Sequence, residues 1–230
     1  MPVFHALLDA LGRSPRLDPV NHPLNMPDRM LSPHKYGDFV LRPVLTDDEE
    51  DWTEVRCCNS SWLEPWEAGD PEGSPGLTFH QWVSSLRKAE DAGSGAVFLM
   101  EFQKQIVGQI SLGAICYGAM RTATVGYWVD QGHIGNGFAP LAVAMLADWA
   151  FFSPSGPHLH RIEIDILPEN KRSLTVVRKL GMHNEGLRKR YMFIRGQWRD
   201  HLAFSLLSDE CEGGVVNRLS MCTRDTPVNT

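Results

Sequence analysis

The order of apolar and polar residues divides the middle of the chain into strand-like and helix-like segments. Three short apolar segments with close connections, at 96–102, 105–115 and 122–130, predict an antiparallel meander. Residues 160–167 alternate isoleucine with acidic residues, which is the two-residue period of a strand. Three further strands are predicted at 38–44, 184–194 and 201–207, which brings the total to seven.

The same patterns predict about four helices between these strands. Residues 78–93 are amphipathic, and residues 137–152 carry a wide apolar face. Thr46 and Glu49 have the spacing of a capping box, which predicts a helix start after the first strand. Asn170 is placed to cap a further helix near the carboxyl end of the domain. Strands and helices of these lengths predict one mixed α/β domain.

Both ends of the chain differ from this pattern. Residues 1–36 contain six prolines and little periodicity beyond the short stretch FHALLDAL, a helix candidate. They predict an N-terminal extension that is either laid on the domain or partly disordered. The polar residues 209–230 predict a flexible C-terminal tail. The domain itself is therefore placed at residues 37–208.

Composition narrows the classes of function. With 230 residues and 43% hydrophobic residues the chain can bury a real core, and it has no run of the roughly 20 apolar residues that cross a membrane. Five scattered cysteines favour a reducing compartment, and no CxxC or HExxH spacing suggests a metal site. The net charge of −6 argues against a nucleic-acid partner. We therefore expect a cytoplasmic protein with no metal, membrane or nucleic-acid partner.

The stretch GHIGNGFAP, residues 132–140, joins a predicted strand to a long apolar helix. A dinucleotide fingerprint would need glycine where the chain has Pro140, and a P-loop would need Gly-Lys-Ser/Thr. Two interpretations remain. The stretch is either a simple strand-to-helix turn that needs small residues, or a cradle whose amides at 134–139 bind a pyrophosphate at a helix N-terminus. The loop alone leaves this choice open.

Motifs further along the chain favour the cradle. The segments GYWVD, LHRIEIDILPEN, KLGM, EGL and GQWRDHLAFSL follow one another in order. With the earlier LRPV and PWE segments, this series across residues 38–208 resembles the GNAT superfamily of acetyl-CoA-dependent N-acetyltransferases, and more narrowly its RimJ/RimL type. The resemblance implies a GNAT fold of the α/β (α+β) class, a mixed, mostly antiparallel seven-strand sheet flanked by about four helices.

The resemblance also implies an activity. It predicts direct transfer of an acetyl group from acetyl-CoA to a primary amine, with the N-terminal α-amine of a ribosomal protein as the favoured acceptor. Two alternatives stay open. The chain could acetylate a small-molecule amine such as an antibiotic, or it could bind acetyl-CoA without catalysis. A monomer and a homodimer are both compatible with the sequence.

In this family the acetyl-CoA contacts come from one strand, one loop and one helix. The strand backbone that binds the pantetheine arm corresponds to Tyr127, Trp128 and Val129. The loop that binds the pyrophosphate corresponds to Ile134, Gly135, Asn136, Gly137, Phe138 and Ala139. Ile134 departs from the usual first residue but keeps its amide. On the helix, Asn170 and Ser173 correspond to positions that face the pantetheine and the thioester sulfur, and Asn170 can also be a helix cap.

The proton donor and acceptor follow less directly from the resemblance. Many GNAT enzymes place a tyrosine where this chain has Val177, so Ser173 is the nearest candidate to protonate the departing thiolate. The strand at 122–130 carries no carboxylate before its last residue. We therefore expect Glu67, in the tryptophan-rich segment WLEPWEAG, to act as base with a pKa raised by its neighbours, or else to be scaffold. Glu101 is a weaker candidate.

Overall fold

The computed structural model describes residues 22–73 and 76–222, and these residues form one sheet of eight strands in the order β1-β2-β3-β4-β5-β6-β8-β7. Only β5 and β6 pair in parallel; every other neighbouring pair is antiparallel. The strands are β1 (Met30–Leu31), β2 (Phe39–Pro43), β3 (Ala96–Phe102), β4 (Gln105–Cys116), β5 (Thr122–Val129), β6 (Arg161–Ile166), β7 (His183–Ile194) and β8 (Gln197–Leu207). The predicted fold class is confirmed, and all seven predicted strands are present.

The eighth strand comes from the N-terminal extension. Met30 and Leu31 pair with β2 at the edge of the sheet, and Leu24 N donates to Glu90 O at 2.8 Å. Of the two interpretations of the extension, residues 22–36 therefore follow the one in which it lies on the domain. The stretch FHALLDAL lies outside the described residues.

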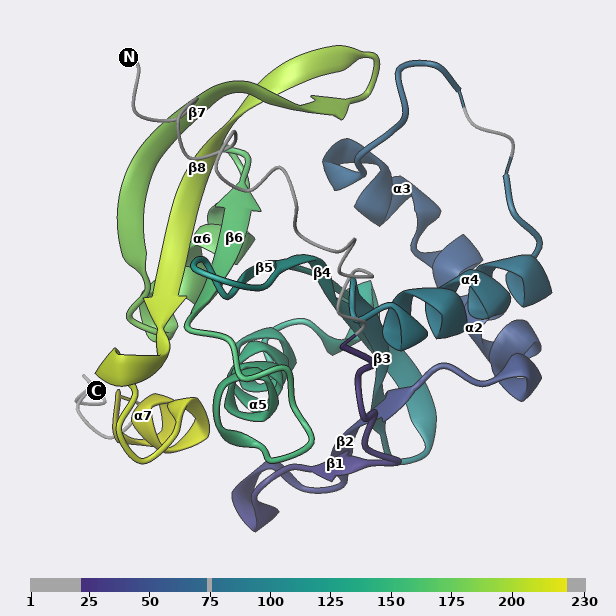
Figure 1. Ribbon diagram of the computed structural model, residues 1–230. Helices are drawn as coiled ribbons and strands as arrows, with labels where there is room; N and C mark the ends of the chain where they lie inside the picture. The colour runs from purple at the N-terminus through teal and green to yellow at the C-terminus, as the bar shows by residue number, and fades with distance from the viewer. Residues whose placement is uncertain (1–21, 74–75, 223–230) are drawn as a thin grey trace, which may run out of the picture.

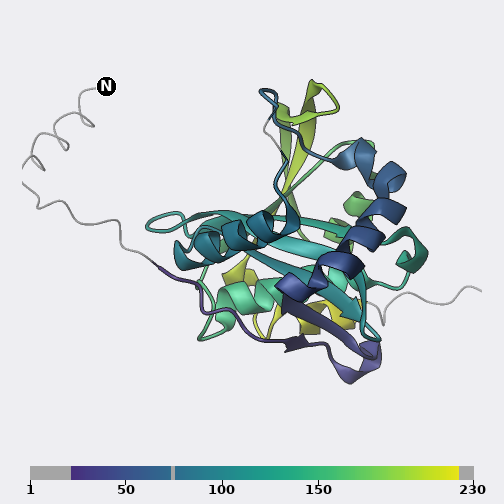
Figure 2. The same ribbon diagram turned by 90° about the vertical axis from the view of Figure 1, so that its right-hand side faces the viewer.

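Helices cover both faces of the sheet (Figure 1, Figure 2). One face carries α2 (Glu49–Cys58), α3 (Ser60–Leu63) and α4 (Phe79–Asp91), whereas α5 (Phe138–Phe152) and α7 (Val215–Cys222) lie on the other. The helix α6 (Lys171–Lys179) follows β6. Short 3-10 turns complete the order: η1 (His34–Tyr36), η2 (Thr46–Asp48), η3 (Glu64–Trp66), η4 (Gln131–His133) and η5 (Ser208–Glu210). Within the described residues no helix is long and apolar enough to cross a membrane.

The helix α5 forms the centre of the larger core. Leu141, Val143 and Leu146 are completely buried, and Phe98 and Ile162 of the sheet belong to the same cluster. A helix that is apolar on nearly all sides needs cover on nearly all sides. The sheet covers one side of α5, and α7 covers another.

The region after β8 corrects the expectation of a flexible tail. Residues 208–222 form η5 and α7, and Val215 and Leu219 are buried in the core. The carboxylate of Asp148, on α5, accepts from Val215 N at 2.5 Å and from Val216 N at 3.1 Å. It therefore satisfies two of the amides at the start of α7 that have no partner within the helix. Residues 223–230 lie outside the described residues.

The start of α2 also differs from the prediction. Thr46 opens η2 instead of capping a helix, and α2 begins at Glu49. Asp48 is the N-cap residue of α2, but its side chain makes no cap hydrogen bond to that helix; its Oδ2 accepts from Leu45 N at 2.7 Å instead, within a capping box of η2. Asp48 is held in place by Arg42 on the neighbouring strand β2. A capping box therefore forms at η2 between Leu45 and Asp48, and not at α2 between Thr46 and Glu49 as predicted.

Candidate active site

The strands β5 and β6 pair over only three residues and then separate. Their parallel register runs from Thr122↔Arg161 to Thr124↔Glu163. β5 nevertheless continues to Val129 and β6 to Ile166. Residues 125–129 of β5 therefore present one edge without a strand partner in the part of the chain that the structure describes. Backbone N–H and C=O groups on such an edge are available to a ligand.

A cavity of about 1490 Å³ opens beside this separation. It is bounded by α2 and η3 on one side and by the glycine loop and α6 on the other. The predicted site residues that line it are Glu67, Tyr127, Trp128, Val129, Ile134, Gly135, Gly137, Phe138, Ala139, Asn170 and Ser173. Asn136 is not among the lining residues, and its side chain donates to His133 O at 3.2 Å instead. The tertiary structure thus brings eleven of the twelve residues to one cavity.

The glycine loop leaves open space at the start of α5. Gly135 and Gly137 have φ angles of 87° and 79°, in the left-handed region that favours glycine. A β-carbon built at either position would meet nothing within 4 Å. Gly137 is the N-cap of α5, so the first amides of that helix have no partners within the helix. The loop therefore offers an anion-binding concavity with room for a phosphate group.

A buried hydrogen-bond network holds this loop against the end of α2. Asn59, which is 1% exposed, donates from Nδ2 to Asp130 Oδ1 at 2.6 Å and accepts from Gln131 N at 2.8 Å. His133 Nδ1 donates to Asp130 Oδ2 at 2.6 Å. Burial raises the pKa of Asp130, but the hydrogen bonds from Asn59 and His133 outweigh it and hold that pKa below its usual range. Sequence reasoning missed Asn59, because its partner is 71 residues away.

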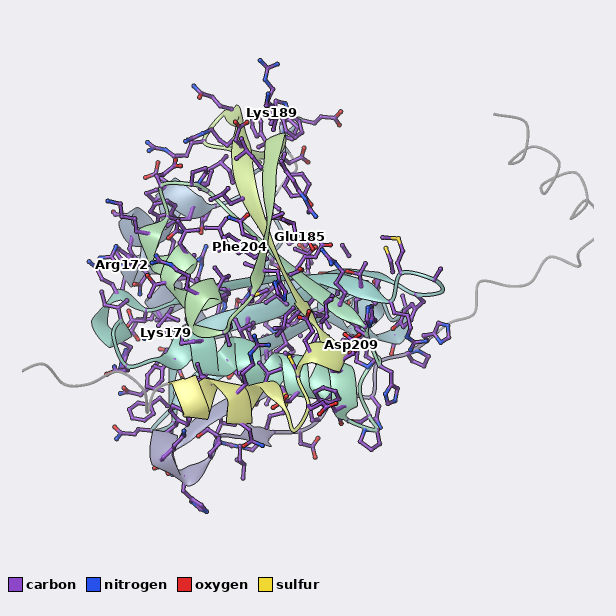
Figure 3. The ribbon with its side chains drawn as sticks, turned by 90° about the vertical axis from the view of Figure 1, so that its left-hand side faces the viewer. Arg172, Lys179, Glu185, Lys189, Phe204 and Asp209 are labelled. Carbon is purple, nitrogen blue, oxygen red and sulfur yellow. The ribbon has the colours of Figure 1, made fainter. Side chains whose placement is uncertain are left out.

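Basic residues of α6 were also missed. Lys171, Arg172 and Lys179 line the cavity, and Figure 3 shows Arg172 and Lys179 at the same edge of the molecule. The Arg172 guanidinium lies 4.5 Å from the centre of the Trp62 ring. Arg172 and Lys179 are seven residues apart, two turns along one helix face, and that spacing was visible in the sequence. Positive charge at this edge suits a phosphorylated ligand.

The polar residues at the start of α6 have two roles. Asn170 Oδ1 accepts from Ser173 N at 3.2 Å, so Asn170 is a helix cap as well as a lining residue of the cavity. Ser173 lies in the first turn and also lines the cavity. Val177, in contrast, is completely buried in the core. The position at which many GNAT enzymes have a tyrosine therefore presents no polar group to this cavity.

Glu67 lines the cavity near Trp62 and Trp66, but its surroundings differ from the expectation. Its side chain is 47% exposed, and its carboxylate pairs with Arg56. Arg56 in turn stacks over the Trp128 ring at 5.2 Å. The expected apolar enclosure is therefore replaced by an ion pair. Only Oε1 of the Glu67 carboxylate pairs with Arg56.

Two other carboxylates bear on the choice of a base. Glu101 does not line the cavity; it binds Arg42 at 2.6 Å and Arg29 at 2.7 Å. Burial raises the pKa of Glu101, but these two arginines outweigh it and hold that pKa below its usual range, which argues against a role as base. Asp165 lies on β6 beyond the last residue paired with β5, and its side chain is fully enclosed beside Arg188. Burial raises the pKa of Asp165.

The described residues contain no group of three or more histidine, cysteine, aspartate or glutamate side chains that could hold a metal ion. The residues named above offer the cavity their side chains and backbone amides. These groups combine an anion-binding loop, an open strand edge and a carboxylate within one space.

Known proteins resemble this chain in sequence and in structure. The family model described as "Acetyltransferase (GNAT) domain" matches residues 38–183. Probable N-acetyltransferase YjcK of Bacillus subtilis is 37% identical over 108 residues, which cover 47% of this chain and 58% of YjcK, less than two thirds of its length. The [ribosomal protein uS5]-alanine N-acetyltransferase of Escherichia coli is 27% identical over 177 residues, 74% of this chain and 89% of the relative. Mycobacterium smegmatis RimJ in complex with CoA-disulfide superposes with a TM-score of 0.78 and 32% identity, over 88% of this chain and 98% of that one.

Proposed function

This chain belongs to the GNAT acetyltransferase family, and on that premise we propose that it transfers the acetyl group of acetyl-CoA to the N-terminal α-amine of a protein. One observation carries the proposal. A single cavity joins a glycine loop suited to phosphate, an unpaired strand edge and a more open region of aromatic and acidic residues. A long ligand with phosphates at one end and a reactive acyl group at the other fits such an arrangement.

Features of the cavity match the separate parts of acetyl-CoA. The loop amides at 134–139 suit the pyrophosphate, and Lys171, Arg172 and Lys179 offer charge to the phosphates. The free edge of residues 125–129 suits the amides of the pantetheine arm, which can pair with it as an added strand. Acetyl-CoA supplies an activated acyl group, and the residues of this chain bind and orient it.

A protein N-terminus suits the other end of the cavity. The names of two relatives specify ribosomal proteins as acceptors, an alanine in one and a serine in the other. An α-amine has an ordinary pKa near ~8, so part of it is neutral at physiological pH and only modest base assistance is needed. Trp62, Trp66 and Trp128 line this end and can pack against an extended peptide. We also propose that the protein acts in the cytoplasm, as a monomer or as a homodimer.

In this proposal each of three groups has its own role in the reaction. A backbone N–H of β5 near Val129 stabilises negative charge on the thioester oxygen. Glu67 accepts a proton from the attacking amine. Ser173 faces the sulfur, which receives the electron pair of the broken carbon–sulfur bond. The nitrogen–carbon bond forms as that bond breaks, and the proton lost by the amine balances the one that the thiolate finally gains.

The valine variant of Gly137 should lose acetyl-CoA affinity. A branched side chain would occupy the space above the loop and displace the phosphates from the amides of α5. Loss of one charge-assisted hydrogen bond predicts a fall of about 10- to 100-fold, measured by calorimetry with acetyl-CoA. Gly73→Val is the matched control, since Gly73 also has a positive φ of 71° and open space but lies outside the cavity. Equal affinities for Gly137→Val and wild type would refute the cradle.

Replacing Ser173 by alanine should reduce kcat more than it raises KM for acetyl-CoA. The contact with sulfur strengthens as charge develops there, so it contributes mainly in the transition state. A fall of roughly 10-fold or more in kcat is expected for a hydrogen bond to a charged group. Thr175→Val is the control, because the Thr175 hydroxyl on the same helix is bonded to Lys171 O at 2.9 Å. Turnover equal to wild type would leave Ser173 without a role at the sulfur.

Acceptor identity is tested by release of free CoA. Peptides with N-terminal alanine or serine are compared with the same peptides blocked at the α-amine, and with a panel of small amines. The proposal expects turnover only with the unblocked peptides. Preference for small amines would replace the protein acceptor, and absence of turnover with every amine despite acetyl-CoA binding would indicate a non-catalytic module.

A further inference from the structure

Arg56 is a cavity residue to which the proposed reaction gives no role of its own. It lies on α2 and lines the large cavity together with Glu67. Its Nη2 donates to Oε1 of the Glu67 carboxylate. Among the described residues, Nη1 and Nε of Arg56 have no hydrogen-bond acceptor although they remain accessible, and Oε2 of Glu67 has no donor. The ion pair therefore keeps unused donors beside an unused acceptor.

Two tryptophan rings hold the Arg56 guanidinium in place. Its central carbon lies 5.2 Å from the centre of the Trp128 ring and 5.8 Å from the centre of the Trp52 ring. Trp52 is fixed in turn, because its Nε1 donates to Gln109 Oε1 at 3.1 Å. A cation over an aromatic ring is stabilised without using its N–H groups as hydrogen-bond donors. The guanidinium is therefore held in position while its remaining N–H groups stay free for a ligand.

The Arg56–Glu67 pair lies between two cavities and close to the strand edge. Four residues line both the large cavity and a smaller one of about 430 Å³: Trp52, Thr53, Arg56 and Glu67. The pair therefore borders open space on two sides. Trp128, over which the guanidinium lies, directly precedes Val129, whose backbone N–H stabilises the thioester oxygen in the proposed reaction. An acceptor amine that reaches the acetyl group thus lies near Arg56 and Glu67.

An α-amine with its own carbonyl group matches this pair of side chains. The nitrogen and the carbonyl oxygen of a first residue lie roughly 3 Å apart, since only the N–Cα, Cα–C and C=O bonds separate them. The unused oxygen of Glu67 can accept from the amine while an unused N–H of Arg56 donates to the carbonyl oxygen. Because Glu67 already balances the charge of Arg56, a neutral carbonyl suits these donors better than a second carboxylate. A lysine ε-amine has no such oxygen beside its nitrogen.

We propose that Arg56 is a specificity-determining residue: it donates a hydrogen bond to the carbonyl oxygen of the acceptor's first residue while Glu67 receives the α-amine of that residue. This inference rests on the proposed function and narrows its acceptor class to an α-amine next to a peptide carbonyl. Acceptors without that oxygen lose the contact with Arg56 and keep the contact with Glu67.

The test removes each partner of this hydrogen bond separately. The acceptors are a peptide with N-terminal alanine and its isostere, in which an alkene replaces the first peptide bond and so removes the carbonyl oxygen. The ratio of kcat/KM for peptide over isostere should be roughly 10–100 times larger for wild type than for Arg56→Met, as expected for a hydrogen bond to a charged group. Differences in intrinsic reactivity between the two acceptors are the same for both proteins and cancel.

Arg199→Met is the matched control. Nη2 of Arg199 pairs with Oε1 of Glu169 as Arg56 pairs with Glu67, and the two arginine side chains are 37% and 27% exposed. Neither Arg199 nor Glu169 lines the cavity, so this variant should keep the wild-type ratio. A ratio that is the same in Arg56→Met and wild type would overturn the inference, because Arg56 would then make no contact with the carbonyl oxygen.

Calorimetry on the complex with CoA measures the same preference without chemistry. Wild type should bind the peptide more tightly than the isostere, and Arg56→Met should bind the two with similar affinities. Equal affinities of wild type for both acceptors would also overturn the inference, and that comparison needs no variant. Because CoA carries no acetyl group, the result holds even if no amine supports turnover, an outcome that would count against the proposed function alone.

Discussion

Glu67→Gln should lower the maximal rate of acetyl transfer by roughly 10²–10⁴-fold at neutral pH, the loss typical when a general base is removed. Glu67 is the residue that follows η3, and it lines the cavity. A glutamine side chain has nearly the same shape as glutamate but does not accept a proton. The loss should shrink as pH rises past the acceptor pKa of about 8, because neutral amine then becomes abundant. Affinity for acetyl-CoA should hardly change. A kcat profile against pH for both proteins measures this.

One control variant and three alternative outcomes determine how that pH profile is interpreted. Glu64→Gln is the matched control, since Glu64 lies on the same short turn outside the large cavity and pairs with Arg195. Identical profiles for wild type and Glu67→Gln would mean that the amine loses its proton to water. A loss of equal size at every pH would mean that Glu67 positions Arg56. A pH-dependent loss in Asp165→Asn alone would transfer the role to that buried carboxyl group, whose pKa burial raises.

Arg42→Met should destabilise the fold by about 3–5 kcal/mol, as expected when a buried ion pair loses one partner. Arg42 donates to both carboxylate oxygens of Asp48 at 2.8 Å and to Glu101 at 2.6 Å. Its side chain is 14% exposed, and those of the two acids are each 10% exposed. Methionine retains the apolar stem but leaves two buried carboxylates without their main partner. Urea unfolding of the two proteins measures the difference.

The control for this effect is Arg195→Met, because Arg195 pairs with Glu64 in an exposed position and should contribute no more than about 1 kcal/mol. The difference between Arg42→Met and wild type should also depend on pH. The pKa of Glu101 is lowered in the folded protein, so its stabilising contribution is present above the ordinary value of about 4.3 and is lost as pH falls through the folded value. A destabilisation below 1 kcal/mol at neutral pH would contradict the assigned network.

Elements with a regular period were predictable from local sequence. The strand expected at 160–167 is β6 (Arg161–Ile166), and the helix expected at 78–93 is α4 (Phe79–Asp91). Alternation places isoleucines on the covered face of β6, and the Thr78 capping box starts α4. The glycine loop was also predictable from local sequence, for a different reason. Gly135 and Gly137 adopt backbone angles that few other residues tolerate, so their sequence positions mark the turn.

The flexible tail was predicted from polarity, and the structure differs because helix α7 depends on a partner elsewhere in the chain. Its first amides are satisfied by Asp148, 67 residues earlier, and its apolar residues cover α5. A short helix of this kind is marginal by itself, and tertiary packing stabilises it. Local polarity could therefore not reveal it.

Local sequence was sufficient to predict the order of seven strands, the place of the glycine loop and the polar residues at the start of α6. Which groups those residues contact depended on how the whole chain folds. The tertiary structure paired Glu67 with Arg56 and joined Asn59 to Asp130. The physical reason is range: backbone conformation responds to neighbours within a few residues, whereas the protonation and orientation of a side chain depend on whichever groups the fold brings within a few ångströms.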